Sequence, residues 1–269
     1  MTSHAFRFGT VGGFSRDGEA WTALARRAED LGYATLLIPD TLTTLSPFTA
    51  AAAAAAVTGR LRVGTYVAAA PYRTPAAVAR EVSTLRTLTG GRFELGIGAG
   101  RPGAEQEAAA LGVRFGTPSE RVQRVADTLD AVDEDVPVLI AAASTRLLRL
   151  AAERADTVAL GLPATATEDD LAAKLDELYE LAGDRFNELE INTNLAAVGD
   201  ELPAWLSQQL GADPREIVAK GGYGILTGTL DQMADTLRRR RDRLGISYVS
   251  VSAQFLEQFA PLVERLAGT

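Results

Sequence analysis

Residues 89–103 read TGGRFELGIGAGRPG, and this stretch contains one turn-strand-loop unit of the fold. Gly90 and Gly91 end the helical pattern that begins at Pro75, since glycine readily takes the left-handed conformation that terminates helices. A strand-like apolar run follows at residues 92–97, and glycine and proline make residues 98–103 a loop. A helix, a tight turn, a strand and an irregular loop in this order are typical of a parallel sheet with crossover helices.

The same alternation of strand and helix continues along the whole chain. The eight strand candidates are residues 6–11, 34–38, 61–67, 92–97, 136–141, 156–160, 189–197 and 247–251. The helix candidates are residues 16–31, 48–57, 75–88, 105–111, 118–132, 145–154, 168–181, 203–210, 214–220, 230–244 and 254–266. An open doubly wound sheet more often has about five to seven strands, whereas a closed barrel has eight in roughly 250 residues. We therefore predict an α/β fold, a (β/α)8 TIM barrel, as a single domain over residues 1–269.

Two stretches of this predicted barrel are longer than a simple connection requires. Residues 99–117 and 198–228 are interpreted as insertions at the C-terminal face of the barrel.

The composition argues against several classes of function. The 269 residues carry a net charge of −8, and nucleic-acid binding needs basic clusters that are missing here. The run from Arg238 to Arg241 is the exception, and the acidic residues around it indicate a solvated helix face. The chain has no cysteine and His4 is its one histidine, so disulfides, thiolate chemistry and a metal site are not expected. No secretory signal or membrane-spanning run is recognisable, which favours a cytoplasmic protein.

The loops after the barrel strands should hold the site, because TIM-barrel enzymes place it at the carboxyl ends of the strands. The stretch AAAST at residues 141–145 combines small side chains, two hydroxyls and the start of a helix, whose amides favour an anion. A phosphate cradle and a simply capped helix are both compatible with it. The glycines at residues 96–101 permit close backbone approach, but their spacing is not that of a dinucleotide-binding fingerprint. A tight barrel rim explains them equally well.

Several segments resemble the bacterial luciferase-like superfamily, and especially its coenzyme F420-dependent oxidoreductase branch from actinobacteria. The similar segments are FRFG at residues 6–9, AEDLGY at 28–33 with LIPD at 37–40, LRVGT at 61–65 with YRTP at 72–75, TGGRFELGIGAG at 89–100, residues 147–156, and GT at 228–229. The resemblance covers essentially the whole chain. It implies a luciferase-like barrel that holds coenzyme F420, with FMN as the alternative cofactor.

The resemblance also implies which residues bind the phosphate tail of that cofactor. The matching segment is the loop between the fifth strand and its helix. Its five residues are Ala141, Ala142, Ala143, Ser144 and Thr145.

The ring of the cofactor would lie against a second group of residues. Thr65, Tyr66 and Val67 match a bulge that often contains a non-proline cis peptide in deazaflavin-using relatives and supports the back of the ring. Asp40 matches a residue beside the ring, although a loop cap on the second strand fits this position equally well. Gly100 lies in the glycine-rich loop that permits close approach to a planar ligand.

Two departures from the family pattern bear on the reaction. Thr41 stands where family members usually carry histidine, and Arg101 stands where sugar-phosphate oxidising relatives carry an acid. Alcohol oxidation needs a base, so we expect instead that reduced coenzyme F420 transfers a hydride to an electrophilic C=C or C=N bond. Tyr66, Arg101 and Glu105 are the candidates for supplying a proton or holding a substrate oxygen.

Two other functions remain open. The first is an FMN-dependent luciferase-like monooxygenase, and the second is a non-catalytic cofactor-binding paralogue. The expected partner is a small-molecule substrate, with Phe14, Tyr66 and Tyr72 as possible apolar walls. Relatives are commonly dimers, and the alanine-rich segment 47–57 would allow close packing of a homodimer.

Overall fold

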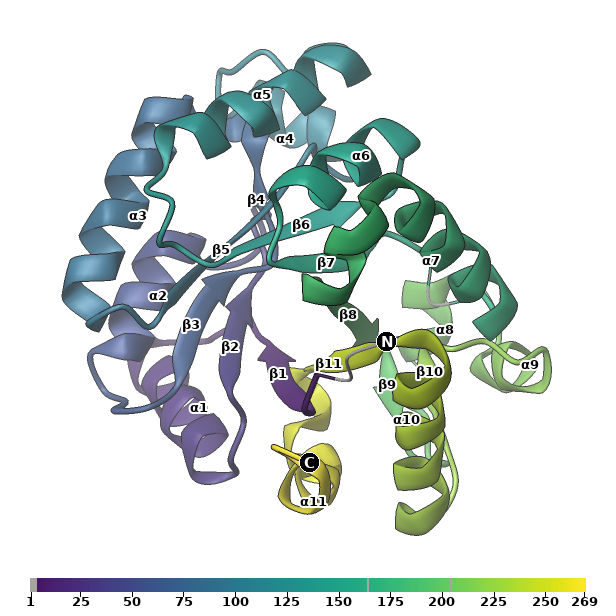
Figure 1. Cartoon of the computed structure of the whole chain (residues 1–269). Coiled ribbons are helices and arrows are strands. Elements are labelled where there is room, and N and C mark those ends of the chain that lie inside the picture. Colours follow the sequence, from purple (N-terminus) through teal and green to yellow (C-terminus); the bar gives the residue numbers. More distant parts are fainter. Residues whose placement is uncertain (1–3, 164, 204) are drawn as a thin grey trace.

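The computed structural model describes residues 4–163, 165–203 and 205–269. Eight parallel strands form a closed barrel, which Figure 1 shows approximately end-on. They are β1 (Arg7–Val11), β2 (Thr35–Ile38), β3 (Arg62–Thr65), β5 (Phe93–Gly98), β6 (Val138–Ala142), β7 (Thr157–Leu160), β8 (Glu190–Leu195) and β11 (Ile246–Ser252). The sheet closes because β3 pairs with both β2 and β5. The predicted (β/α)8 barrel is confirmed.

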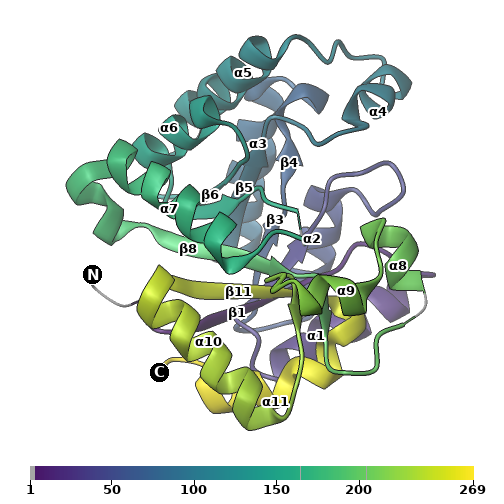
Figure 2. The same cartoon turned by 90° about the vertical axis from the view of Figure 1, so that its right-hand side faces the viewer.

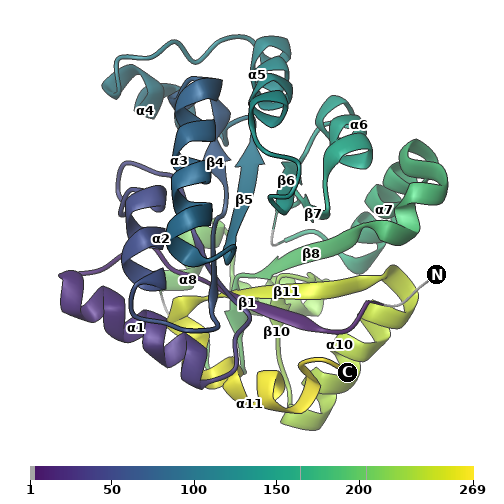
Figure 3. The ribbon, with the colours of Figure 1, turned by 60° about the vertical axis from the view of Figure 1, so that its left-hand side comes forward.

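Helices surround the barrel on its outer side (Figure 1). They are α1 (Gly18–Asp30), α2 (Pro47–Ala55), α3 (Pro75–Thr89), α5 (Pro118–Ala131), α6 (Thr145–Arg154), α7 (Glu168–Ala182), α10 (Leu230–Leu244) and α11 (Leu256–Leu266). Figure 3 shows α1, α2 and α3 following one another around the outside. The predicted bounds of α6 and α10 are confirmed. Each helix starts directly after a residue whose hydroxyl caps it, Ser144 for α6 and Thr229 for α10. The left-handed Gly90, with φ of 61°, ends α3 as expected.

Three further helices lie at the carboxyl ends of the strands. They are α4 (Ala104–Ala110), α8 (Trp205–Leu210) and α9 (Pro214–Ala219), and Figure 2 shows them at the end of the molecule opposite to both chain termini. The predicted insertions at residues 99–117 and 198–228 therefore do extend from this face, although residue 204 of the predicted helix 203–210 lies outside the described residues. None of the helices in the described part of the chain is both long and apolar enough to cross a membrane.

Two predicted strands are shorter than expected. The run 61–67 is not one strand: β3 ends at Thr65, and pairing with β5 resumes only at β4 (Ala68–Ala69). The run 189–197 is also divided, since β8 leaves the barrel after Leu195 and β9 (Ala197–Val198) pairs with β10 (Ile225–Leu226) in a separate small sheet. Both interruptions result from pairing with strands that are distant in sequence. The apolar pattern does not show this pairing, so it predicted one continuous strand at each place.

The barrel interior is layered along its axis. At the amino ends of the strands, Arg7 forms ion pairs of 2.6 Å with both Glu94 and Glu190, and Arg62 also pairs with Glu94. The Tyr248 ring stacks on the Arg7 guanidinium, 3.8 Å from its centroid, and is fully buried. This paired ionic layer and the tyrosine above it fill the floor of the barrel. The carboxyl end is therefore the end at which a ligand can enter.

The alanine-rich helix α2 packs mainly inside its own subunit. Ala50, Ala51 and Ala54 are buried against the barrel, whereas Ala53 and Ala56 are exposed. Only a narrow strip of the segment expected to form a dimer thus faces outward. The homodimer stays a prediction.

The division between β3 and β4 depends on glycine in the neighbouring strand. A Cβ atom at Gly96 would lie 2.0 Å from the carbonyl oxygen of Thr65, a distance that no side chain permits. We predict that Gly96→Ala lowers the free energy of unfolding by about 1–3 kcal/mol or more, as overpacking does in rigid interiors. Urea denaturation measures this. Gly18→Ala is the matched control, because a Cβ there meets nothing within 4 Å. Equal unfolding midpoints for the two variants would contradict the prediction.

Candidate active site

Small side chains surround the mouth of the barrel at the carboxyl ends of the strands. The register places the last inward-facing residue of each strand at this level. Among them are Val11 in β1, Gly98 in β5, Ala141 in β6, Asn194 in β8 and Ser252 in β11. All but Gly98 are half-buried, as expected for residues that line an opening. These side chains line the opening of the barrel at this end.

A bulge at the end of β3 forms one wall of the mouth. The peptide bond between Tyr66 and Val67 is cis, which confirms the expected non-proline cis peptide. Thr65 is fully buried, and its hydroxyl donates to the Gly96 carbonyl at 2.5 Å and accepts from the Gly96 amide at 3.0 Å. The Thr65 hydroxyl therefore makes its hydrogen bonds within the protein. Tyr66 and Val67 face the interior with Ala141, so a ligand would meet these two residues.

Tyr66 belongs to a polar chain inside the barrel that the sequence interpretation missed. Its hydroxyl donates to Oδ1 of Asn192 at 2.7 Å, and Asn192 Nδ2 donates to the Tyr248 carbonyl at 3.2 Å. Ser250 donates to Oδ1 of Asn194 at 3.1 Å in the same region. Burial raises the pKa of Tyr66 well above its usual range, so the hydroxyl stays protonated at ordinary pH. A signal was available: two asparagines two residues apart in β8 must share a face.

The loop between β6 and α6 lies open at the same end of the barrel. Ala142 is buried and Ala141 half-buried, whereas Ala143, Ser144 and Thr145 are exposed. Ser144 caps the helix by accepting a hydrogen bond from the Leu147 amide. The amides of the first helical turn have no acceptor within the helix, and they favour an anion. The Glu177 side chain of α7 reaches the Thr145 hydroxyl at this end of α6.

Gly161 explains why the loop can lie so close to the neighbouring strand end. A Cβ at this position would come within 2.8 Å of Ala143 Cβ and 3.1 Å of the Ala143 amide nitrogen. The Gly161 amide also donates to the Ala142 carbonyl at 2.9 Å. Glycine after β7 thus holds the loop against the mouth.

Asp40, expected beside the ring, is held by neighbouring groups. Its carboxylate accepts from Arg73 at 2.5 and 3.2 Å and from the Ala69 amide at 3.0 Å, and its side chain is only 6% exposed. Asp40 therefore ties the end of β2 to the segment just after the bulge. Arg73, which no pattern singled out as a site residue, supplies the charge that neutralises it.

Arg101 and Glu105 lie on the rim instead of beside Tyr66. Arg101 pairs with Glu107 of α4 and donates to the Pro102 carbonyl, while half of its side chain remains exposed. Glu105 is exposed on the first turn of α4. Gly100, with φ of 90°, provides the turn that leads into this rim segment. The structure therefore brings Tyr66 and the β6 loop to the mouth and leaves these two charged residues on its edge.

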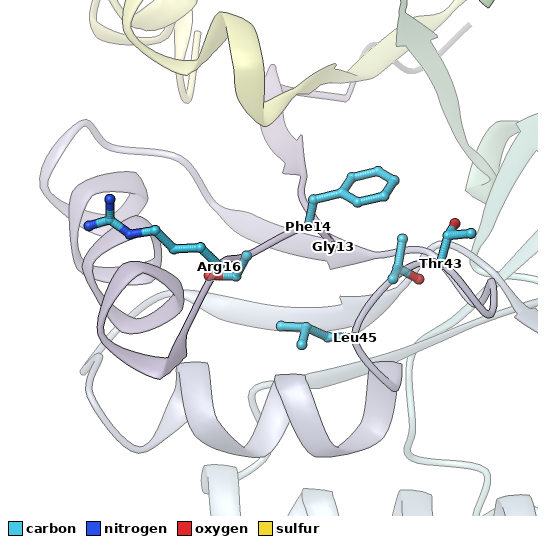
Figure 4. A pocket seen from close by; sticks show the side chains of 7 residues that line it. Gly13, Phe14, Arg16, Thr43 and Leu45 are labelled. Atoms are coloured by element: carbon cyan, nitrogen blue, oxygen red, sulfur yellow. The ribbon is translucent and has the colours of Figure 1, made fainter.

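A cavity of about 410 Å³ lies beside the mouth, in the loops after β1 and β2 (Figure 4). Its lining residues are Gly13, Phe14, Ser15, Arg16, Thr43, Thr44 and Leu45. Figure 4 shows the Arg16 side chain extending away from the others. Phe14 is 70% exposed, which makes it an available apolar surface. Tyr72, also expected as a wall, is buried instead and donates to Glu107 at 2.8 Å.

Thr41 shapes the same loop. Its amide donates to the Thr44 hydroxyl at 3.3 Å, and that hydroxyl lies 3.0 Å from the Thr41 carbonyl. His4 precedes β1 and so lies at the opposite end of the barrel. The described residues contain no group of three or more histidine, cysteine or acidic side chains that could hold a metal ion.

Comparisons with known proteins agree with this architecture. Residues 2–134 match the family model of the luciferase-like monooxygenases. The 4-hydroxyprotoasukamycin monooxygenase of Streptomyces nodosus subsp. asukaensis is 40% identical over 87 residues, which span 32% of this chain and 22% of that protein.

Similar solved structures extend over nearly the whole chain. The coenzyme F420-dependent tetrahydromethanopterin reductase from Methanopyrus kandleri has a TM-score of 0.76 at 17% identity, covering 98% of this chain and 99% of that one. The 3,6-diketocamphane monooxygenase from Pseudomonas putida, solved with FMN, has a TM-score of 0.70 at 16% identity, covering 97% and 95%. The amino-terminal half of the chain therefore matches the luciferase-like monooxygenase family, and the whole chain has the same barrel fold as these solved structures.

Proposed function

We propose that this chain is an oxidoreductase that binds a flavin or deazaflavin at the carboxyl end of the barrel, in one domain over residues 1–269. The observation that carries the proposal is the open start of α6 beside a mouth lined by small residues. An anionic tail would meet the exposed residues Ser144 and Thr145 at the start of α6, and a planar ring would lie against Ala141, Tyr66 and Val67.

The proposed contacts divide between tail and ring. The loop from Ala141 to Thr145 would hold the phosphate. Tyr66 and Val67 would lie behind the ring, with Asp40 holding the bulge in place through the Ala69 amide. When bound, a reduced deazaflavin supplies a hydride and a reduced flavin can also react with oxygen.

The protein's own contribution to the chemistry centres on Tyr66. Its raised pKa keeps the hydroxyl protonated, and Asn192 fixes its direction. To give a proton to a substrate atom that gains electrons, the hydroxyl would first exchange its bond to Asn192 for one to that atom. Arg101 and Glu105, on the rim, are placed to hold a polar substrate group as it enters, while Phe14 offers an apolar surface.

We propose coenzyme F420 as the cofactor and an electrophilic C=C or C=N bond of a small molecule as the hydride acceptor. Thr41 and Arg101 stand where alcohol-oxidising relatives would need a base and an acid. The likeness to a coenzyme F420-dependent reductase supports this cofactor. A cytoplasmic homodimer is part of the same proposal.

An FMN-dependent monooxygenase is the second candidate function. It is favoured by the 40% identity over 87 residues to a named monooxygenase and by the likeness to a barrel solved with FMN. The same tail site and the same small-residue mouth would serve both cofactors.

Anaerobic titration separates the candidates. The purified protein is titrated with FMN and with coenzyme F420, followed by ring absorbance. The reduced cofactors are then mixed with 2-cyclohexen-1-one or a cyclic imine, with and without oxygen. Oxygen-independent reoxidation of reduced F420 is the expected result. Oxygen-dependent turnover with reduced FMN alone would establish the second candidate, and binding without turnover would indicate a non-catalytic cofactor-binding paralogue. A folded protein that binds neither cofactor would contradict the proposed site.

We predict that Ser144→Asp weakens binding of either cofactor about tenfold or more. Aspartate caps helices as well as serine does, so α6 should stay intact while the new charge repels the phosphate. Ser144→Asn is the matched control, because asparagine caps the helix without a charge and should change the affinity less than about threefold. Fluorescence titration measures both. Equal affinities for the aspartate and asparagine variants would place the phosphate elsewhere.

We predict that Tyr66→Phe lowers turnover by about 100-fold or more, the usual contribution of a positioned acid, with cofactor affinity nearly unchanged. Stopped-flow absorbance measures the chemical step. Tyr33→Phe is the control. This variant also loses one buried hydrogen bond, the bond to the Leu256 carbonyl, but at a place outside the barrel interior. Because burial raises the Tyr66 pKa, wild-type turnover should persist up to about pH 10, where free tyrosine ionises. Equal rates for both variants would remove Tyr66 from the reaction.

A further inference from the structure

The 99–117 excursion, the segment from Ala99 to Thr117 that contains α4, begins and ends beside one side chain. Arg121, on the second turn of α5, donates from Nε to the Ala99 carbonyl and from Nη1 to the Gly116 carbonyl, each at 2.9 Å. These two carbonyls belong to the first residue of the excursion and to the residue before its last. A single guanidinium thus joins both ends of a loop about 19 residues long.

The same guanidinium also fixes an aromatic ring inside the excursion. Arg121 lies over the Phe115 ring, 4.3 Å from its centroid. The ring in turn packs against Gly100, where a Cβ would come within 2.8 Å of Phe115 Cε2. The planar fork of arginine can bond two carbonyls and stack on a ring together, which lysine cannot do.

Other contacts of the excursion lie along α4 and near its carboxyl end, where Arg114 pairs with Glu120. Ala104 and Ala108 are buried against Tyr72, and Glu107 joins Tyr72 to Arg101. These contacts hold α4 and one end of the segment, whereas among the side chains that the structure describes Arg121 alone bonds both ends. The Arg121 contacts therefore hold the backbone beside Gly100 in place, while Glu107 also holds the Arg101 side chain.

We propose that Arg121 is a positioning residue, a clamp that holds the 99–117 excursion closed at its base and so sets where Gly100 and Arg101 lie at the mouth. The functional meaning of this clamp rests on the proposed function, because Gly100 and Arg101 are residues of that site. The clamp itself rests on the contacts of the guanidinium alone. Loss of the clamp should loosen the excursion locally without unfolding the barrel.

Native-state trypsin cleavage tests the clamp. Arg114 is a cleavable site within the excursion and is exposed, whereas Arg101 precedes proline and resists the enzyme. Cleavage of a native protein reports the population of the open form when reclosing is fast. The rate of cleavage after Arg114 is measured for wild type, Arg121→Lys and Arg121→Met, with cleavage after Arg86 in α3 as the report on global unfolding.

The cleavage rate after Arg114 is expected to differ between the two variants. Arg121→Met should raise cleavage after Arg114 roughly tenfold or more, as loss of charge-assisted bonds implies, and Arg121→Lys should raise it less because it keeps one donor. Cleavage after Arg86 should stay at the wild-type rate. Arg124→Met, one turn further along α5, is the matched control, since no hydrogen bond of its side chain is found among the described residues.

Two results would overturn the clamp. One is cleavage after Arg114 at the wild-type rate in Arg121→Met. The other is equal acceleration after Arg86 and Arg114, which would make Arg121 a general stabilising residue. Titration of the same variants with FMN and coenzyme F420 keeps the two proposals apart. If neither cofactor binds wild type, the proposed function fails while the cleavage pattern still decides the clamp.

Discussion

The close contact between the end of β3 and strand β5 is the constraint on which the shape of the mouth depends. Thr65 bonds to both the amide and the carbonyl of Gly96, and the space where a Gly96 side chain would lie is filled by the Thr65 carbonyl. Strand β5 must therefore have glycine at this position. Gly98, the next inward position, has Val67 within 2.9 Å of its own missing Cβ. Gly96 and Gly98 thus accommodate the protein's own bulge, and the bulge then presents Tyr66 and Val67 to the mouth.

The two ends of the barrel interior differ in their electrostatics. The amino end contains two arginines and two glutamates whose charges compensate one another, under the Tyr248 ring. The carboxyl end contains uncharged groups, chiefly Tyr66, Asn192 and Ser250, and the amides at the start of α6. With a net charge of −8, the chain as a whole would repel an anion. A site for an anionic cofactor therefore needs a local source of positive potential, which a helix start supplies without a charged side chain.

Arginine bonded to backbone or carboxylate recurs around the mouth. Arg73 holds Asp40, which also bonds the Ala69 amide, and Arg121 holds the two ends of the 99–117 excursion. In each case a planar guanidinium joins segments that the strand ladder does not reach. Loops at this face carry the proposed site residues, so the positions of those residues depend on such side-chain bonds as well as on the barrel. The barrel supplies the rigid frame, and these arginines fix the parts attached to it.

The sequence by itself determined the fold class and most element bounds, because periodicity, helix caps and glycine stops are local signals. The bounds of α6 and α10 follow directly from their caps. Local signals also located the loop at residues 141–145, and a family resemblance indicated the bulge at residues 65–67. Only the tertiary structure decided what lies opposite each residue. In the folded protein Asp40 pairs with Arg73, and Arg101 and Glu105 lie on the rim. Tyr66 bonds to Asn192, which lies 126 residues away in the chain. Such pairings arise when eight strands close into a ring, and no local pattern records which inward positions then meet.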